Sequence, residues 1–253
     1  MNNQSTHLNL NTWTEIRDYL KRSKTIILPI GSTEQHGPTG AIGTDALTAE
    51  AISMRVGEMT NTIVAPVVSY GMAEHHLGFP GTMSLKPSTF QLVLHDLIFS
   101  LALNGFQKIF VINGHGGNIA SAKAAFSEVY KTIENNRINF EGNFKCKLLN
   151  WFMLQEIYQL SRELYGDNEG QHATPSEIAI TMHLEPELVA KNKELPPPSP
   201  AGPIYDKNDF MRRYPDGRMG SVPYLAKSEH GALLLEKSSK ILSDLLFSFI
   251  KEQ

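Results

Sequence analysis

Four short apolar runs, rich in β-branched residues, constrain the fold of this chain more than any other feature. They span residues 25–30, 62–69, 108–112 and 144–151. The first three are apolar at nearly every position, which is typical of strands buried on both faces of a parallel sheet. The fourth has a weaker pattern, and we expect a strand at each.

Segments with helical periodicity separate these runs. Apolar residues recur at every third or fourth position over 90–101 and again over 153–164, and Gly105 and Gly166 follow them as stop signals. One further helix is expected over 231–250. Strands that alternate with amphipathic helices predict an α/β fold, in which a mostly parallel sheet carries helices on both faces.

The Pro/Gly-rich stretch 195–220 has no periodicity, and we expect it to form a surface loop. A linker between two domains is the alternative, but too few residues follow it to form a second core. The sequence therefore predicts a single domain over 1–253.

Composition excludes several classes of protein. The chain has 23 lysines and arginines against 26 acidic residues, and a net charge of −3 argues against a nucleic-acid partner held through its phosphates. Cys146 is the single cysteine, so neither a disulfide nor a Cys-rich zinc site can form within the chain. The sequence contains no apolar run near the ~20 residues of a membrane span, and its polar beginning lacks a signal-peptide core. We expect a cytoplasmic protein with no membrane partner.

Residue types that bind metals and move protons are concentrated in three segments. GSTEQHG at 31–37 directly follows the first expected strand, with Asp45 a little further on, and NGHGGN at 113–118 follows the third expected strand. EGQHATPSE at 169–177 leads into a helix. Loops at the carboxyl ends of parallel strands meet at one edge of a sheet, where ligands bind. We therefore expect the first two segments to lie close together.

Four side chains from these segments form a candidate metal site. Glu34 and His36 are two residues apart, so in an extended segment both point to the same side. Asp45 adds a second carboxylate and His115 a second imidazole, and such nitrogen and oxygen ligands suit Zn²⁺, Mn²⁺ or Fe²⁺. A shared carboxylate, for which Asp45 is the candidate, would bridge two ions about 3.5–4 Å apart.

Each of these residues also has a structural alternative. Asp45 is placed to cap the helix that follows it, Glu34 could pair with a surface lysine, and either histidine could be an ordinary core or surface residue. The glycines around His115 could instead hold a phosphate, although GHGG differs from the dinucleotide-binding pattern. Four such groups directly after buried strands are costly to bury unpaired, which favours the metal site.

Glu177 has two interpretations that the sequence leaves open. Thr174 and Glu177 fit a capping box at the start of a helix, with Pro175 in its first turn. Alternatively, Glu177 is the last ligand of a second ion. His172, on the preceding loop, is free either to shuttle protons near the metals or to have no catalytic role.

Five stretches of the sequence match one enzyme family. They are LPIGSTEQHGPTGAIGTDA at 28–46, HLGFPGTMSL at 76–85, FVINGHGGN at 110–118, QHATPSE at 171–177 and GRMGSVPYLAKSEHG at 217–231. In this order and spacing they resemble the creatininase (creatinine amidohydrolase) family, over roughly residues 10–245. The resemblance implies a three-layer α/β/α sandwich with a mostly parallel central sheet, usually assembled into hexamers, with two divalent ions per active site. It also implies hydrolysis of non-peptide C–N bonds in cyclic or formylated amides.

The resemblance further assigns ligands and reveals departures. Creatininase has a carboxylate ligand at the position that Gly117 occupies here, so we expect Glu177 to complete the second set. Gln171 stands where creatininase has Glu, which counts against creatinine itself as the substrate. The ligands implied by the family motifs are Glu34, Asp45 and His115 for one ion and His36 and Asp45 for the other.

The residues and the resemblance together predict a metal-dependent amidohydrolase. A water that bridges the two ions would lose a proton, because coordination brings its pKa to about 7, and the hydroxide would attack a carbonyl. His172 would protonate the leaving nitrogen as general acid. His76 and Tyr70 are expected to line the substrate pocket, and the N–H groups of Gly116 and Gly117 to stabilise the oxyanion.

Two alternative functions stay open at this point. The same site could hydrolyse a lactone or an ester, since only the leaving group differs. A non-catalytic relative could bind a small ligand with the glycine-rich loop and would hold no tight metal. In each case we expect a small-molecule partner and a homo-oligomer, which the resemblance implies to be a hexamer.

Overall fold

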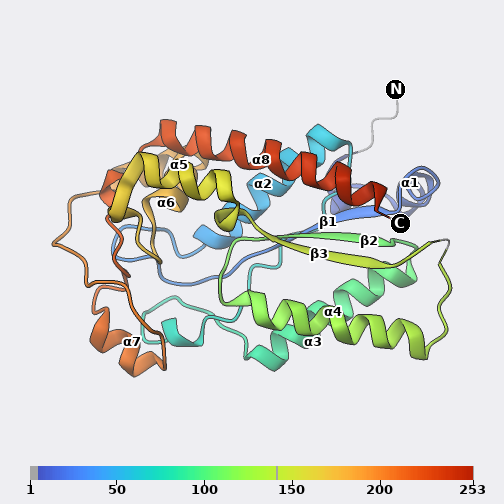
Figure 1. Cartoon of the computed structure of the whole chain (residues 1–253), viewed down its shortest axis with the longest axis horizontal. Helices are drawn as coiled ribbons and strands as arrows, with labels where there is room; N and C mark the ends of the chain where they lie inside the picture. The colour runs from blue at the N-terminus through green and yellow to red at the C-terminus, as the bar shows by residue number, and fades with distance from the viewer. Residues whose placement is uncertain (1–4, 141, 253) are drawn as a thin grey trace.

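The computed structural model of the protein describes residues 5–140 and 142–252 and has three layers (Figure 1). Its strands are β1 (Thr25–Ile30), β2 (Lys108–Asn113) and β3 (Lys145–Asn150). Its α-helices are α1 (Trp13–Tyr19), α2 (Thr44–Thr60), α3 (Pro87–Leu103), α4 (Asn118–Asn135), α5 (Gln155–Tyr165), α6 (Pro175–Leu184), α7 (Lys207–Arg213) and α8 (Ser228–Lys251). The strands pair in parallel in the order β1-β2-β3, with α2, α5, α6 and α8 on one face and α3 and α4 on the other. The predicted α/β/α architecture is confirmed.

Strands β1 and β2 are buried on both faces, which explains why they lack polar alternation. Ile27 and Phe110 point to the core formed with α2, α5, α6 and α8. Ile26, Leu28 and Val111 point to the opposite core, formed with α3 and α4. All six residues of β1 are buried, as the sequence predicted for a parallel strand.

The segment 62–69, which we expected to be a strand, is not one. It makes only two isolated parallel bridges to β1, at Val64 and at Val68. The hydrogen bonds to β1 shift register here, because the N–H of Ala65 donates to Ile27 while that of Val68 donates to Pro29. Pro29 itself has no N–H to donate toward this segment, so a continuous ladder does not form. The segment still follows the free edge of β1, because the N–H of Ala65 donates to a β1 carbonyl over 2.8 Å.

The stretch 195–220, which we expected to be a surface loop, contains α7 and part of the core. Phe210, Tyr214 and Met219 form a buried cluster of their own. Asp206 starts α7, because its side chain accepts hydrogen bonds from two N–H groups of the first turn. The sequence signal was weak because this seven-residue helix has a single large buried side chain.

The other expected elements are present with small shifts of their ends. The helices expected over 90–101, 153–164 and 231–250 correspond to α3, α5 and α8, and the strand expected over 144–151 corresponds to β3. Within the described residues, no helix combines the length and the apolar character needed to cross a membrane.

Candidate active site

The candidate site lies where the carboxyl ends of β1 and β2 meet the start of α2. A Cβ atom at Gly31 would lie 2.5 Å from the backbone of Ala46, and one at Gly114 would collide with the carbonyl oxygen of Asp45. Glycine after each strand therefore allows the first turn of α2 to pack against the sheet edge. This packing places the Asp45 carboxylate beside the side chains that follow both strands.

The first group of candidate ligands consists of Glu34, Asp45 and His115. Nδ1 of His115 is 3.0 Å from Oδ2 of Asp45 and 3.2 Å from Oε2 of Glu34. Nε2 of this ring lies 2.9 Å from the carbonyl oxygen of Met72, which can only accept, so Nε2 carries the proton. In the neutral ring the lone pair of Nδ1 then faces the two carboxylates, an arrangement typical of metal-binding histidines.

The second group consists of His36, Asp45 and Glu177. Nε2 of His36 is 3.1 Å from Oδ1 of Asp45 and 3.8 Å from Oε1 of Glu177. Nδ1 of the same ring donates to the carbonyl oxygen of Glu34 over 3.1 Å, which leaves Nε2 facing the carboxylates. In each group the three ligand atoms lie within 4.8 Å of one another. Asp45 contributes one oxygen to each group, as expected for a bridging carboxylate.

These residues fit divalent cations. Oδ2 of Asp45, which faces the first group, is buried and has no hydrogen-bond partner. Burying unpaired carboxylate oxygens is costly, and a cation is the partner that would offset the cost. Carboxylate oxygen and imidazole nitrogen are ligands that Zn²⁺, Mn²⁺ and Fe²⁺ accept. Glu34 is fully buried and therefore does not form the surface ion pair named as its alternative.

Electrostatics show how strongly the cluster attracts positive charge. Burial alone would lower the pKa of His36, but the carboxylates of Asp45 and Glu177 raise it to about 10. His115 behaves in the same way, since Glu34 and Asp45 raise its pKa well above the usual value despite burial. Burial would raise the pKa of Asp45, but both histidines lower it. Without metal, protons therefore occupy this centre, and a cation would displace them.

The geometry of Glu177 fits both interpretations, the helix cap and the metal ligand. Its Oε1 accepts the N–H of Thr174 over 2.6 Å, and its own N–H donates to Oγ1 of Thr174 over 3.3 Å, which completes the capping box. The same Oε1 belongs to the second ligand group. Asp45, in contrast, is not the N-cap of α2, because that position is Gly43 and Asp45 lies within the first turn.

His76 and His172 lie on the other side of Glu34. Nε2 of His76 is 3.3 Å and Nδ1 of His172 is 3.7 Å from Oε1 of Glu34, and these atoms form a third group of possible ligands. Burial lowers the pKa of both rings below the usual value, and the charge of His36 adds to the effect on His172. Both rings are therefore neutral at pH 7.

Two cavities of about 400 and 530 Å³ meet at this centre. His172 and Gly116 line both cavities, and His76 and Gly117 line the second. Tyr70 lines neither, and its side chain is 48% exposed, so the structure places it outside these two cavities.

Comparison with known proteins identifies the family of this chain. The model of the creatininase family, described as creatinine amidohydrolase, matches residues 9–246. The chain belongs to the creatininase family. It is 28% identical to the 3-dehydro-scyllo-inosose hydrolase of Thermotoga maritima, over 94% of this chain and 83% of that protein. It is 26% identical to the creatinine amidohydrolase of Pseudomonas putida, over 93% of this chain and 94% of that protein.

A solved structure named "Creatininase Mn" superimposes with a TM-score of 0.86 at 24% identity, covering 98% of this chain and all of that one. At this identity the superposition shows the fold alone. It agrees with the three layers seen here, and the creatininase fold therefore positions the cluster described above.

Several residues to which sequence reasoning assigned no role in the site support this creatininase-family centre. Ser32 donates to Oε2 of Glu34 over 2.8 Å, and Ser221 donates to the carbonyl oxygen of His172 over 2.6 Å. Arg218 is fully buried beside Gly37 and pairs with Asp216. Gln35, between two candidate ligands in the first motif, contacts two histidines. Its position inside the motif was the one signal available.

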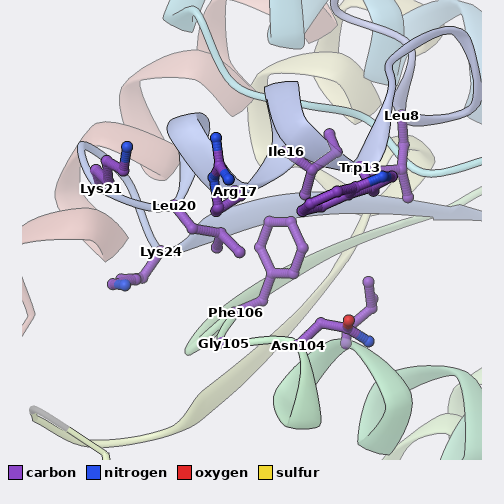
Figure 2. A pocket seen from close by; sticks show the side chains of 11 residues that line it. Leu8, Trp13, Ile16, Arg17, Leu20, Lys21, Lys24, Asn104, Gly105 and Phe106 are labelled. Atoms are coloured by element: carbon purple, nitrogen blue, oxygen red, sulfur yellow. The ribbon is translucent and has the colours of Figure 1, made fainter.

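A larger hollow of about 660 Å³ lies elsewhere, at the amino ends of β1 and β2 (Figure 2). Ile16 and Leu20 from the α1 region face Phe106 there, with Trp13 beside them and Lys24 at the rim. Its lining contains no carboxylate and no histidine. This hollow therefore lacks the ligands of the creatininase-family centre, which lies at the opposite ends of the strands.

Proposed function

We propose that this protein is a metal-dependent hydrolase that cleaves a non-peptide C–N bond in a small cyclic or formylated amide. The observation that carries the proposal is the pair of buried ligand groups that share Asp45. The Pseudomonas putida relative is named an amidohydrolase, and solved creatininase structures are named for Mn or for a Zn–Zn type.

Two divalent ions, Zn²⁺, Mn²⁺ or Fe²⁺, fit the donor atoms of the centre. Such ions polarise a carbonyl group and make a water molecule more acidic when they are bound. The residues that would hold them are Glu34, Asp45 and His115 for one ion and His36, Asp45 and Glu177 for the other.

The chain itself supplies proton transfer and orientation. His172 is neutral, lines both cavities and presents Nδ1 toward Glu34. It accepts a proton at Nδ1 and returns it to the leaving nitrogen as general acid. The backbone N–H groups of Gly116 and Gly117, at the start of α4, stabilise negative charge that develops on the substrate oxygen. His76 lines the substrate cavity next to His172.

The proposal also covers the substrate and the assembly of the chains. The substrate is a small molecule that occupies one or both of the cavities at the centre. The chain acts as one domain in a homo-oligomer, a hexamer by family resemblance, and sedimentation of the purified protein would measure the number of chains.

Metal content and a substrate panel test the function together. We expect two ions per chain by elemental analysis, loss of activity after chelation and its return with Zn²⁺, Mn²⁺ or Fe²⁺. Formamides and lactams should be hydrolysed faster than lactones. Preference for lactones would favour the lactone or ester hydrolase, which needs the same residues. A protein with no tight metal and no hydrolysis would be the non-catalytic binding relative.

A further inference from the structure

The side-chain amide of Gln35 lies between the two histidine rings that face Glu34. Its Nε2 is 2.9 Å from Nδ1 of His76 and 3.0 Å from Nε2 of His172. The rings are stacked, with their centroids 4.2 Å apart. Gln35 is buried, so the amide and the rings meet away from solvent.

Two backbone groups define the orientation of this amide. The N–H of Gly37 donates to Oε1 of Gln35 over 2.8 Å, so the NH₂ end faces the rings. On that side Nε2 also donates to the carbonyl oxygen of Gly217 over 3.0 Å. Gly217 has a φ of +85° and packs directly on the amide, and a Cβ atom there would collide with it. The orientation is therefore fixed independently of either ring.

This orientation determines which ring nitrogens carry protons. Nε2 of His172 is 2.8 Å from the backbone carbonyl oxygen of Gln35, which can only accept, so this Nε2 is the donor. The two N–H bonds of the amide are then directed to Nδ1 of His76 and to the Gly217 carbonyl. Nδ1 of His76 is an acceptor, and the proton of that neutral ring is on Nε2.

We propose that Gln35 is a positioning residue, which holds His172 with a free Nδ1 and His76 with a protonated Nε2, both directed at Oε1 of Glu34. Its catalytic consequence rests on the proposed function, because a free Nδ1 lets His172 accept the proton that hydrolysis releases. The Nε2 proton of His76 also excludes that nitrogen as a ligand. The third group, Glu34 with His76 and His172, thus handles protons and holds no third ion.

The proton positions can be measured without any substrate. We expect long-range ¹H–¹⁵N spectra of the zinc-loaded, ¹⁵N-histidine-labelled protein to show both His76 and His172 as neutral rings protonated on Nε2. The variants His76→Asn and His172→Asn assign the signals, and elemental analysis should find two zinc ions in both variants. A proton on Nδ1 of either ring would overturn the proposal, as would the loss of a third zinc equivalent in His76→Asn.

Two variants of Gln35 test the positioning itself. Gln35→Glu keeps the shape and the acceptor for Gly37 but has no N–H to donate, so the proton of His76 should move to Nδ1. We expect kcat to fall about 10- to 100-fold, the range for residues that orient a reacting group, with KM and the two ions nearly unchanged. Gln35→Met, of similar length, should lower kcat less, because it removes the donor without imposing a charge.

These outcomes separate the positioning role from the proposed function. Wild-type kcat and wild-type ring spectra in both Gln35 variants would overturn the positioning role. A wild-type protein that hydrolyses no member of the panel would contradict the proposed function, while its ring spectra would still test the proton positions. If both variants fail to fold, the spectra of the wild-type protein decide alone.

Discussion

The two ligand groups share Asp45 but differ in what else their atoms do. In the group at the strand ends, Oδ2 of Asp45 is buried and has no hydrogen-bond partner. In the group at the start of α6, Oε1 of Glu177 already accepts the N–H of Thr174 over 2.6 Å. It is also 3.8 Å from His36, whereas His115 is 3.0 Å from Asp45.

This difference indicates which of the two ligand groups is better prepared to bind a cation. Burial raises the pKa of Glu177 to about 7, so this carboxyl group holds a proton more readily than an ordinary glutamate. An ion in the second group must displace that proton and share an oxygen with a helix cap. We therefore expect the strand-end group to bind its ion more tightly.

The largest effect is expected for Asp45→Asn, because Asp45 is common to both groups. The amide keeps the shape of the side chain but loses one charge from each group. Both ions should be weakened, and activity should fall by about 1,000-fold or more, comparable to the loss of electrostatic stabilisation of a transition state. Two ions retained after dialysis of the variant would refute the bridging role.

His172→Ala is expected to separate proton transfer from metal binding. His172 belongs to neither of the two groups, so both ions should remain. Loss of a general acid should lower kcat about 100- to 1,000-fold, measured on the best substrate of the panel. His183→Ala, at an exposed position near the end of α6, is the matched control and should keep wild-type activity. An unchanged rate in His172→Ala would remove this residue from the mechanism.

Glu177→Gln is expected to affect one group only. Glutamine still accepts the N–H of Thr174, so the helix cap remains, but the second ion loses its charged ligand. Elemental analysis should find one ion per chain, and activity should fall about 10- to 100-fold. Thr174→Val is the control that removes the cap hydroxyl and keeps the ligand. It should lower the free energy of unfolding by about 1 kcal/mol and keep both ions. If Glu177→Gln kept both ions and full activity, Glu177 would be a helix cap and no ligand.

The pH dependence of stability should also distinguish metal-free from metal-loaded protein. Folding raises the pKa of Glu177 from its usual 4.5 to about 7, so the protonated carboxyl group stabilises the folded metal-free protein. This contribution to the free energy of unfolding is fully present below pH 4.5 and is lost as the pH rises through 7. His36 acts in the same direction, from its usual 6.5 up to about 10. Metal binding removes these protons and strengthens with pH. The gain in Tm on metal addition should therefore grow from pH 6 to pH 8, and a constant gain would contradict this.

The neighbourhood of Glu34, His36 and His115 could be predicted from the sequence because it follows from a general rule. Residues directly after parallel strands meet at one edge, so Glu34, His36 and His115 had to lie near one another once the strands were assigned. The strand predicted over 62–69 is absent for a local reason, since the hydrogen bonds to β1 shift register between Ala65 and Val68 and Pro29 has no N–H to donate. Glu177 stayed ambiguous because one oxygen fits both interpretations.

The surroundings of the cluster could not be predicted, because they depend on long-range packing. The amide of Gln35 is oriented by Gly37 and by Gly217, a residue 182 positions away in the chain. Nothing in the pattern of 207–213 indicated that Phe210 would pack edge-on against His76, with their ring centroids 4.6 Å apart. Such contacts are properties of the folded chain and have no periodic signal.

The smallest effect is expected at Tyr70, which sequence reasoning placed at the substrate and the structure places outside both cavities. Its side chain is 48% exposed, and a surface substitution of this kind changes free energies by less than about 0.5 kcal/mol. Tyr70→Phe should therefore change neither kcat nor KM by more than about twofold. A clear rise in KM would mean that the substrate extends past His76 to this surface. Tyr70 would then belong to the substrate-binding residues.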